Sequence, residues 1–369
     1  MSDKQIQKAG DNSAQVQMVN PTFVCGIDEK RVREVCSEMA LETVKVCTTE
    51  ATAVALDRIE QFTTMLLPRV EQIERKFNSF SDPSFQTLLR KAQLVAACSE
   101  RPVDYEMLSE LLVHRINNKN NTKKKASISK AVEIINDIDI DSLCALTILH
   151  CVCNFIPVTG NISDGISTLA DLYDKLDYNK LPSDRLWIDN LSILGCMTTA
   201  SFFTPNSFED RFCKVLDGYM CVGIKRGSEN YDKAVQLLKD NNFGVGIFVE
   251  HELLDGYVRL QISQKDRIEN LSYTTISIID GIQHTRKNSL TESQKKCLRD
   301  IFEMYSKDGN LKNKVRQKFI DLLMSHVSIK VISKWWNDFN TAFSLTSVGK
   351  VIAHANAQRI DNTLPNLDE

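Results

Sequence analysis

The sequence predicts an α+β protein that is predominantly α-helical, with a long helical hairpin, a helical bundle and one small β-α-β-β sheet. Three observations favour this class. Apolar residues recur at steps of three and four over most of the 369 residues. The 8 prolines and 14 glycines are fewer than a loop-rich all-β fold would use. Strand-like alternation is concentrated in one stretch, at about 219–263.

The composition is that of an ordinary folded protein, with 43% apolar and 25% charged residues. A net charge of −3 indicates no bulk attraction to nucleic acid or to an anionic membrane. The first 20 residues lack a secretory signal, so the 11 scattered cysteines are interpreted as buried thiols. The longest apolar run, Ser142–Val158, is interrupted by His150 and Asn154 and is interpreted as a core helix. We therefore expect a cytoplasmic protein with no membrane contact.

The amino-terminal third is expected to hold a strand-like tag and a long hairpin. Residues 1–26 are polar and need another surface, such as a second subunit, to pair with. Residues 27–116 show a helical period, in which Pro68 is expected to kink or divide the first helix. A second helix should begin at Asp82 and Pro83, and a third at about 104. A helix of this length favours a partner helix, within the chain or as a coiled coil.

The remaining chain is divided by changes in pattern. A bundle over 117–218 should open with an exposed loop, "NNKNNTKKKAS", followed by helices at about 127–137, 141–156, 163–177 and 182–201. The sheet lies in 219–265, and a basic helical region over 266–342 precedes a closing helix and tail at 343–369.

The closing stretch "FSLTSVGKVIAHANAQR" predicts a helix capped by Thr346 or Ser347. Gly349 and the alanines should let another helix or a strand approach closely, and His354 is expected to be a satisfied residue at the boundary of the apolar stripe. The apolar stripe consists of Val348, Val351, Ile352 and Ala355.

One stretch could bind a small anion. In "GIKRGSENY" a strand leads into a turn, and Ser228 can cap the following helix, whose free N–H groups favour negative charge. The anion-binding candidates are Lys225, Arg226, Gly227 and Ser228. The alternative is an ordinary capped helix beside a basic turn, since the stretch lacks the spaced glycines of a phosphate loop.

A nucleic-acid surface is a second possibility. Residues 286–334 hold twelve Lys or Arg against five Asp or Glu, and two tryptophans follow. Basic helices with aromatic side chains can hold a nucleic-acid backbone and its bases. The candidates are Lys123, Lys124, Lys125, Lys312, Lys314, Arg316, Trp335 and Trp336. The alternative is that the tryptophans are core residues and the lysines form a solvated face.

The sequence contains only incomplete matches to known metal-binding motifs and no common catalytic motif. "HELLD" at His251–Asp255 lacks the second histidine of the zinc-protease pattern, and "HCVC" at His150–Cys153 lacks a second ligand pair. His150 is therefore interpreted as a core histidine, and the carboxylates around His251 as a solvated acidic rim, namely Glu250, Glu252 and Asp255. No nucleophile elbow, phosphate loop or dinucleotide fingerprint occurs. We expect no metal and no cofactor, and the pattern leans away from an enzyme.

The chain resembles, from end to end, an uncharacterised family of bacterial cytoplasmic proteins. The resemblance rests on "AGDNSAQVQ", "DPSFQ", "DYEMLSELLVHR", "GYMCVGIKRGSENYDKA" and "LTSVGKVIAHANAQR". The resemblance implies no activity and no catalytic residues, and it associates the chain with mobile or antiviral-defence genes.

These features together predict a non-enzymatic, self-associating interaction or sensor protein, with a possible protein partner from a neighbouring gene. The alternatives are a nucleic-acid binder and an effector that binds a phosphate or nucleotide ligand at Lys225–Ser228. The leading interpretation depends on the expectation that polar side chains from distant parts of the chain do not converge in a cleft.

Overall fold

The computed structural model describes residues 28–45, 48–74, 77–200, 206–279, 282–339 and 341–367, and only the backbone at 245, 275–279, 282–284 and 339. The predicted tag at 1–26 lies outside the described residues. Within them the protein is predominantly helical with small antiparallel sheets, which confirms the predicted fold class.

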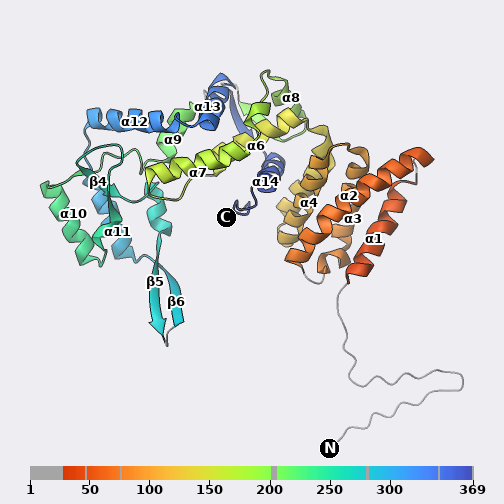
Figure 1. Cartoon of the computed structure of the whole chain (residues 1–369), viewed down its shortest axis with the longest axis horizontal. Helices are drawn as coiled ribbons and strands as arrows, with labels where there is room; N and C mark the ends of the chain where they lie inside the picture. Colours follow the sequence, from red (N-terminus) through yellow and green to blue (C-terminus); the bar gives the residue numbers. More distant parts are fainter. Residues whose placement is uncertain are drawn as a thin grey trace, which may run out of the picture.

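The first helices stack at one end of the molecule (Figure 1). They are α1 (Glu29–Thr43), α2 (Thr49–Ile73), α3 (Pro83–Cys98), α4 (Pro102–Asn117) and α5 (Thr122–Ile134), with the short 3₁₀ helices η1 (Asn78–Ser81) and η2 (Ile135–Asp137) between them. The predicted start of α3 is confirmed, because the Asp82 carboxylate accepts from the Ser84 N–H and Pro83 occupies the first turn.

Two predictions in this part were wrong, at least in part. The α2 helix continues through Pro68, so this proline does not divide it, whereas the predicted kink stays a prediction. The helical run is divided before the cap residue Thr48 instead. The predicted loop at 117–127 is helical from Thr122, because the Asn121 side chain accepts from the Lys124 N–H and begins α5.

The middle of the chain forms α6 (Ile140–Asn154), α7 (Ile162–Lys175), η3 (Tyr178–Lys180) and α8 (Leu186–Ile193). The α6 helix is buried from Ser142 to Val152, which confirms the core helix predicted there. The predicted helix at 182–201 is wrong at its end. Residues Met197–Ala200 form β1, which pairs antiparallel with β7 (Ala342–Leu345).

The predicted β-α-β-β unit is confirmed with shorter strands. It contains β2 (Ile224–Lys225), α10 (Glu229–Asp240), η4 (Val245–Ile247), β3 (Phe248–Glu250) and β4 (Tyr257–Leu260), and the strand order is β2-β4-β3, all antiparallel. Its apolar face packs on α10 and α11 (Glu292–Glu303) and forms a core of its own. The α9 helix (Phe208–Val215) precedes this unit and η5 (Lys265–Asn270) follows it.

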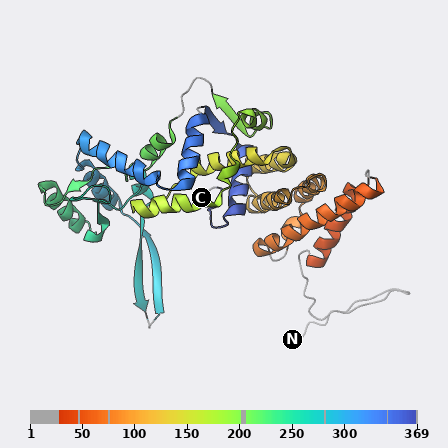
Figure 2. The same cartoon turned by 45° about the horizontal axis from the view of Figure 1, so that its top comes forward.

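A second hairpin was missed. Strands β5 (Ser272–Ile279) and β6 (Ile282–Ser289) pair antiparallel and project from the body as an arm (Figures 1 and 2). The Asp280-Gly281 dipeptide between two runs of alternating residues is the sequence signal for such a hairpin. The basic helices predicted beyond it are confirmed as α11, α12 (Gly309–Leu323) and α13 (Val327–Phe339).

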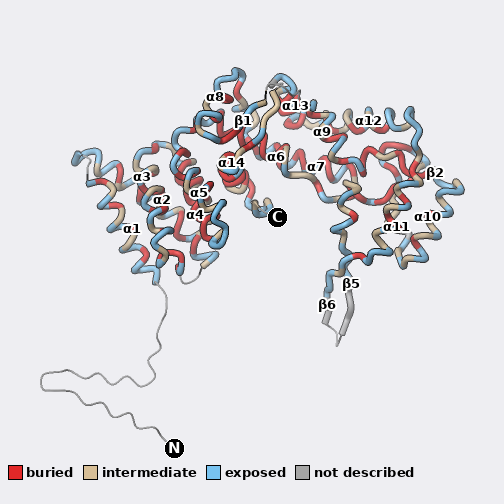
Figure 3. The backbone as a smooth tube through the Cα atoms, turned by 180° about the vertical axis from the view of Figure 1, so that it is seen from behind, coloured by how far each residue is buried: buried red, intermediate tan, exposed pale blue. Residues whose placement is uncertain are grey.

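The closing helix α14 (Ser347–Ile360) lies in the centre of the molecule, against α4, α5 and α6 (Figure 3). Thr346 caps it as predicted, since its hydroxyl accepts from the Gly349 N–H at 3.1 Å. The predicted close approach is also confirmed, because a Cβ at Gly349 would overlap the carbonyl oxygen of Cys196. Gly349 and residues Val351–Ala357 are buried, so α14 joins the helical bundle to the rest of one large core.

Candidate functional site

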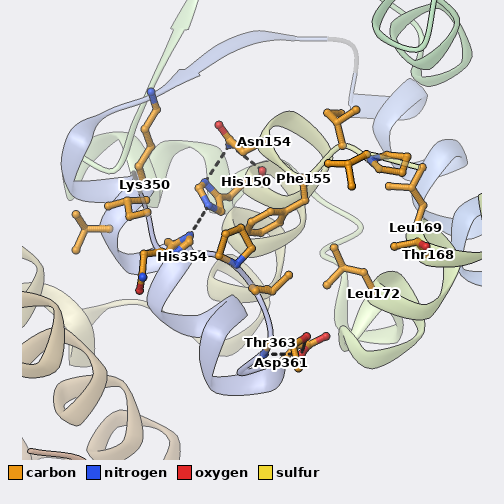
Figure 4. Close-up of a pocket in the computed structure, with 18 of the residues that line it drawn as sticks. His150, Asn154, Phe155, Thr168, Leu169, Leu172, Lys350, His354, Asp361 and Thr363 are labelled. Carbon is orange, nitrogen blue, oxygen red and sulfur yellow. Dashed lines mark hydrogen bonds between the residues drawn. The ribbon is translucent and has the colours of Figure 1, made fainter. Parts of the chain in front are cut away.

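A pocket of about 1200 Å³ lies beside α14 (Figure 4). Ligand pockets typically enclose roughly 300–1000 Å³, so this space can hold a sizeable small molecule. Its walls come from parts of the chain that are far apart in sequence: α5, α6 and the loop after it, α7, η5, α14 and the tail at 361–367. The expectation that polar groups from distant segments do not converge was therefore wrong.

A chain of hydrogen bonds connects two buried histidines at one side of this central pocket (Figure 4). His150 on α6 and His354 on α14 are each 2% exposed. Nε2 of His150 lies 3.2 Å from Nδ1 of His354, and the Asn154 amide nitrogen lies 3.1 Å from Nδ1 of His150. His114 on α4 packs beside His354 with its ring centroid 5.6 Å away.

The hydrogen-bond partners determine which nitrogens carry protons. The Asn154 amide also donates to the carbonyl of His150, at 2.8 Å, so the atom facing Nδ1 of His150 is the NH₂ group. Nδ1 of His150 is then an acceptor, and its Nε2–H donates to Nδ1 of His354. The remaining nitrogen of His354, Nε2, therefore carries a hydrogen and is a donor.

This nitrogen is closed off from solvent and forms no hydrogen bond at normal distance, and the Pro365 carbonyl beside the ring acts to raise the pKa of His354. Burial, followed by His114 and His150, lowers the pKa of His354 to about 3, so the ring is neutral at physiological pH. Burial and then Lys350 lower the pKa of His150 to about 4. His354 was expected at the boundary of the apolar stripe, and this part of the prediction was wrong, because the residue is 2% exposed. The prediction that His150 is a core histidine is confirmed.

The pocket is lined by more positive than negative side chains. Two of the residues that line it are acidic, Asp171 and Asp361. Five are basic: Lys123, Lys124, Lys175, Arg267 and Lys350. The hydrogen bond from Lys175 (2.6 Å), followed by that from Thr363, lowers the pKa of Asp361 to about 2, so this carboxylate is ionised.

The loop that walls the pocket after α6 is held by side chains of the β-sheet unit and its flanks. The Tyr219 hydroxyl donates to the Thr159 carbonyl and the Arg259 guanidinium to the Gly160 carbonyl, both at 2.6 Å. Glu252 accepts from the first N–H groups of α7, at 2.7 Å from the nitrogen of Ile162. Glu252 is exposed, as the predicted solvated rim requires, and it also caps α7, so the sheet unit positions one wall of the pocket.

The predicted anion site at Lys225–Ser228 is a turn and capped helix start, as its sequence indicated. Ser228 accepts from the Tyr231 N–H, and Gly227 adopts a left-handed conformation (φ +71°). Arg226, however, forms an ion pair with Glu250. The four residues do not line the central pocket, and their role in anion binding stays a prediction.

The predicted nucleic-acid residues lie on separate parts of the molecule. Lys123, Lys124 and Lys125 are in the first turn of α5, whereas Lys312, Lys314 and Arg316 are on α12, away from α5 (Figure 3). Arg316 forms an ion pair with Asp210 at 2.6 Å.

Both tryptophans contact protein groups. Trp336 is 6% exposed and donates to the Asn206 carbonyl. Trp335 donates to the Pro182 carbonyl and packs against Trp187, with ring centroids 5.4 Å apart. The nucleic-acid interpretation stays a prediction, and the pocket contains only its lysines Lys123 and Lys124.

The histidine of "HELLD" has a structural role. His251 is buried, its Nε2 lies 2.8 Å from the Cys221 carbonyl, and its Nδ1 accepts from the Leu253 N–H. Within the described ranges, no three His, Cys, Asp or Glu side chains gather in a way that could hold a metal ion. Every helix in those ranges is too short or too polar to cross a lipid bilayer.

A protein-family model matches residues 26–368, and the chain belongs to that uncharacterised family. A search of curated proteins found no match, and neither did a search of solved structures. The family places no function on the chain, so the function must be argued from the central pocket.

Proposed function

We propose that the protein is a sensor: it binds a small molecule in the central pocket, and binding changes how its surface interacts with other proteins. The observation that carries this proposal is the cavity of about 1200 Å³, whose walls come from α5, α6, α7, η5, α14 and the tail.

The position of the pocket supports a sensing role over a catalytic one. His150 and His354 are neutral and far too weakly basic to act as general bases near neutral pH, given pKa values of about 4 and 3. In contrast, the pocket touches α14, the bundle and a loop held by the sheet unit. A ligand bound there contacts the helical bundle, the closing helix and the loop that the sheet unit holds, so occupancy can alter surfaces remote from the pocket.

Thermal unfolding tests the binding step. We expect at least one compound of a mixed panel (adenosine, AMP, ATP, glucose, lysine, octanoate and octanamide) to raise the melting temperature of the full chain, because a ligand that binds only the folded state stabilises it. The matched control is Thr168→Trp. Thr168 is exposed on α7 and lines the pocket, so the indole should fill the space without disturbing the core.

The thermal panel can support or contradict the proposed ligand binding. A compound that stabilises the wild type and not Thr168→Trp supports the proposal. A panel without any response, or a response that Thr168→Trp retains in full, contradicts it.

The same proposal includes the cellular location, the self-association and the protein partner that were expected from the sequence. The sensor would work in the bacterial cytoplasm, self-associate through the 1–26 tag or its long helices, and act with a neighbouring-gene partner in antiviral defence. The segments "AGDNSAQVQ" and "LTSVGKVIAHANAQR" would mark its relatives. Light scattering tests self-association: a monodisperse monomer at micromolar concentration, with and without residues 1–25, contradicts that part.

A further inference from the structure

The electrostatics of the central pocket differ from those of the chain. The whole chain has a net charge of −3, yet five basic and two acidic residues line the pocket. The basic residues come from α5, α7, η5 and α14, so the fold and not the local sequence gathers them. A concave surface with one sign of charge concentrates its field and attracts the opposite ion.

Two of these cations are available to a ligand. Lys175 is engaged by Asp361, and Arg267 donates to the Gln264 side chain. The ammonium groups of Lys123 and Lys350 have no ion-pair partner among the residues that the structure describes. Lys350 extends at the His150 and Asn154 end of the pocket, whereas Asp361 and Thr363 lie at the other end (Figure 4). The Lys175–Asp361 ion pair makes that end neutral overall, whereas the ammonium of Lys350 attracts an anion to the opposite end.

The Lys350 ammonium supplies hydrogen-bond donors as well as charge, since a lysine side chain carries three N–H donors and no acceptor. Phosphate and carboxylate oxygens are strong acceptors of such bonds.

Apolar side chains form much of the rest of the wall. They come from α6, the loop after it, α7 and the tail, and include Phe155, Ile156, Leu169, Leu172, Leu364 and Leu367. A bare inorganic anion would leave this surface uncovered, whereas a ligand with an apolar or heterocyclic body would bury it.

We propose that the central pocket binds a small organic anion, in which a phosphate or carboxylate group is joined to an apolar or heterocyclic body. This inference rests on the proposed sensing function and specifies its ligand. The charged group lies at the end where Lys350 extends, and the body packs against the Phe155 and Leu172 side.

Matched pairs of probes test the need for charge. Isothermal titration of the full chain compares AMP with adenosine and octanoate with octanamide, so that the members of each pair share a body and differ in charge. We expect the charged member of at least one pair to bind about tenfold or more tightly than its neutral partner. The pair that responds distinguishes a phosphate from a carboxylate source.

Lysine variants test the source of the attraction. Lys123→Gln/Lys350→Gln should weaken binding of the charged probe about tenfold or more and leave the neutral probe unchanged. Both residues are exposed, so the folded state should persist. The matched control, Lys312→Gln/Lys314→Gln, removes two exposed lysines of α12 that do not line the pocket, and it should bind as the wild type does.

The titration results test the anion inference independently of the proposed sensing function. If the neutral probes bind as tightly as the charged ones, or the pocket double variant binds normally, the anion inference is overturned while small-molecule binding stands. If neither pair binds, the anion inference is overturned. If, in addition, no compound of the thermal panel responds, the sensing function is overturned with it.

Discussion

Replacing Gly349 by alanine will destabilise the protein by about 3 kcal/mol, the upper end of the usual range for substitutions that force atoms into a packed core. The new methyl group would overlap the carbonyl oxygen of Cys196, which belongs to the backbone. This carbonyl has little room to move, because Thr346 donates to it and β1 begins at the next residue. Urea unfolding monitored by circular dichroism measures the loss.

Gly309→Ala is the matched control. Gly309 is also a helical glycine, at the start of α12, and a Cβ there would meet no atom within 4 Å. Its unfolding midpoint should stay close to that of the wild type. If Gly349→Ala unfolds at the same urea concentration as Gly309→Ala, the close packing of α14 on Cys196 is contradicted.

Acidification will destabilise the protein through the buried histidines well before most carboxylates are protonated. The pKa values of His150 and His354 are about 4 and 3 in the folded protein, against about 6.5 for an unfolded chain. The unfolded chain therefore takes up protons below about pH 6.5 that the folded protein does not, and stability falls as the pH falls toward the folded values. At about pH 5 this amounts to roughly 2 kcal/mol for each histidine, or about 4 kcal/mol for the pair.

Urea unfolding at a series of pH values between about 7.5 and 5 measures this loss. His150→Asn/His354→Asn removes both titrating rings, so its stability, lower at neutral pH, should decline less steeply on acidification. A wild-type unfolding free energy that stays constant over this range would show that the rings are not held neutral by burial.

Sequence patterns predicted most helices because the signals are local. The Asp82-Pro83 start of α3 and the Thr346 cap of α14 each lie within a few residues of the helices they begin. Two predictions about local structure, the loop at 117–127 and the absence of a second hairpin, were wrong even though the sequence contains the relevant signals. Asn121 is a good cap residue, but the lysines after it favoured a loop interpretation, and Asp280-Gly281 marked a hairpin that was not predicted.

Long-range pairings escaped prediction for a different reason. Strands β1 and β7 are four residues each and pair across more than 140 positions, from Met197 to Leu345. Neither strand is long enough to show a reliable alternation by itself.

The central pocket could not be predicted from the sequence. His150 and His354 are 204 residues apart, and each looks like an isolated histidine on an apolar helix. The donor role of His354 follows only from the Asn154 contact, which depends on the packing of α6 against α14. Likewise the basic residues of the pocket come from four elements, and only the start of α5 shows a run of lysines in the sequence.

The central position of α14 has a consequence for synthesis on the ribosome. The Asn356 side chain of α14 binds the hydroxyl of Thr147 on α6, 209 residues earlier. At elongation rates of about 5–20 residues per second, synthesis of the residues between α6 and α14 takes roughly 10–40 s, and the apolar groove that later binds α14 is empty during this time. The apolar side chains of this groove are exposed to solvent during that interval. We therefore expect the folding yield of the protein in cells to depend strongly on chaperones.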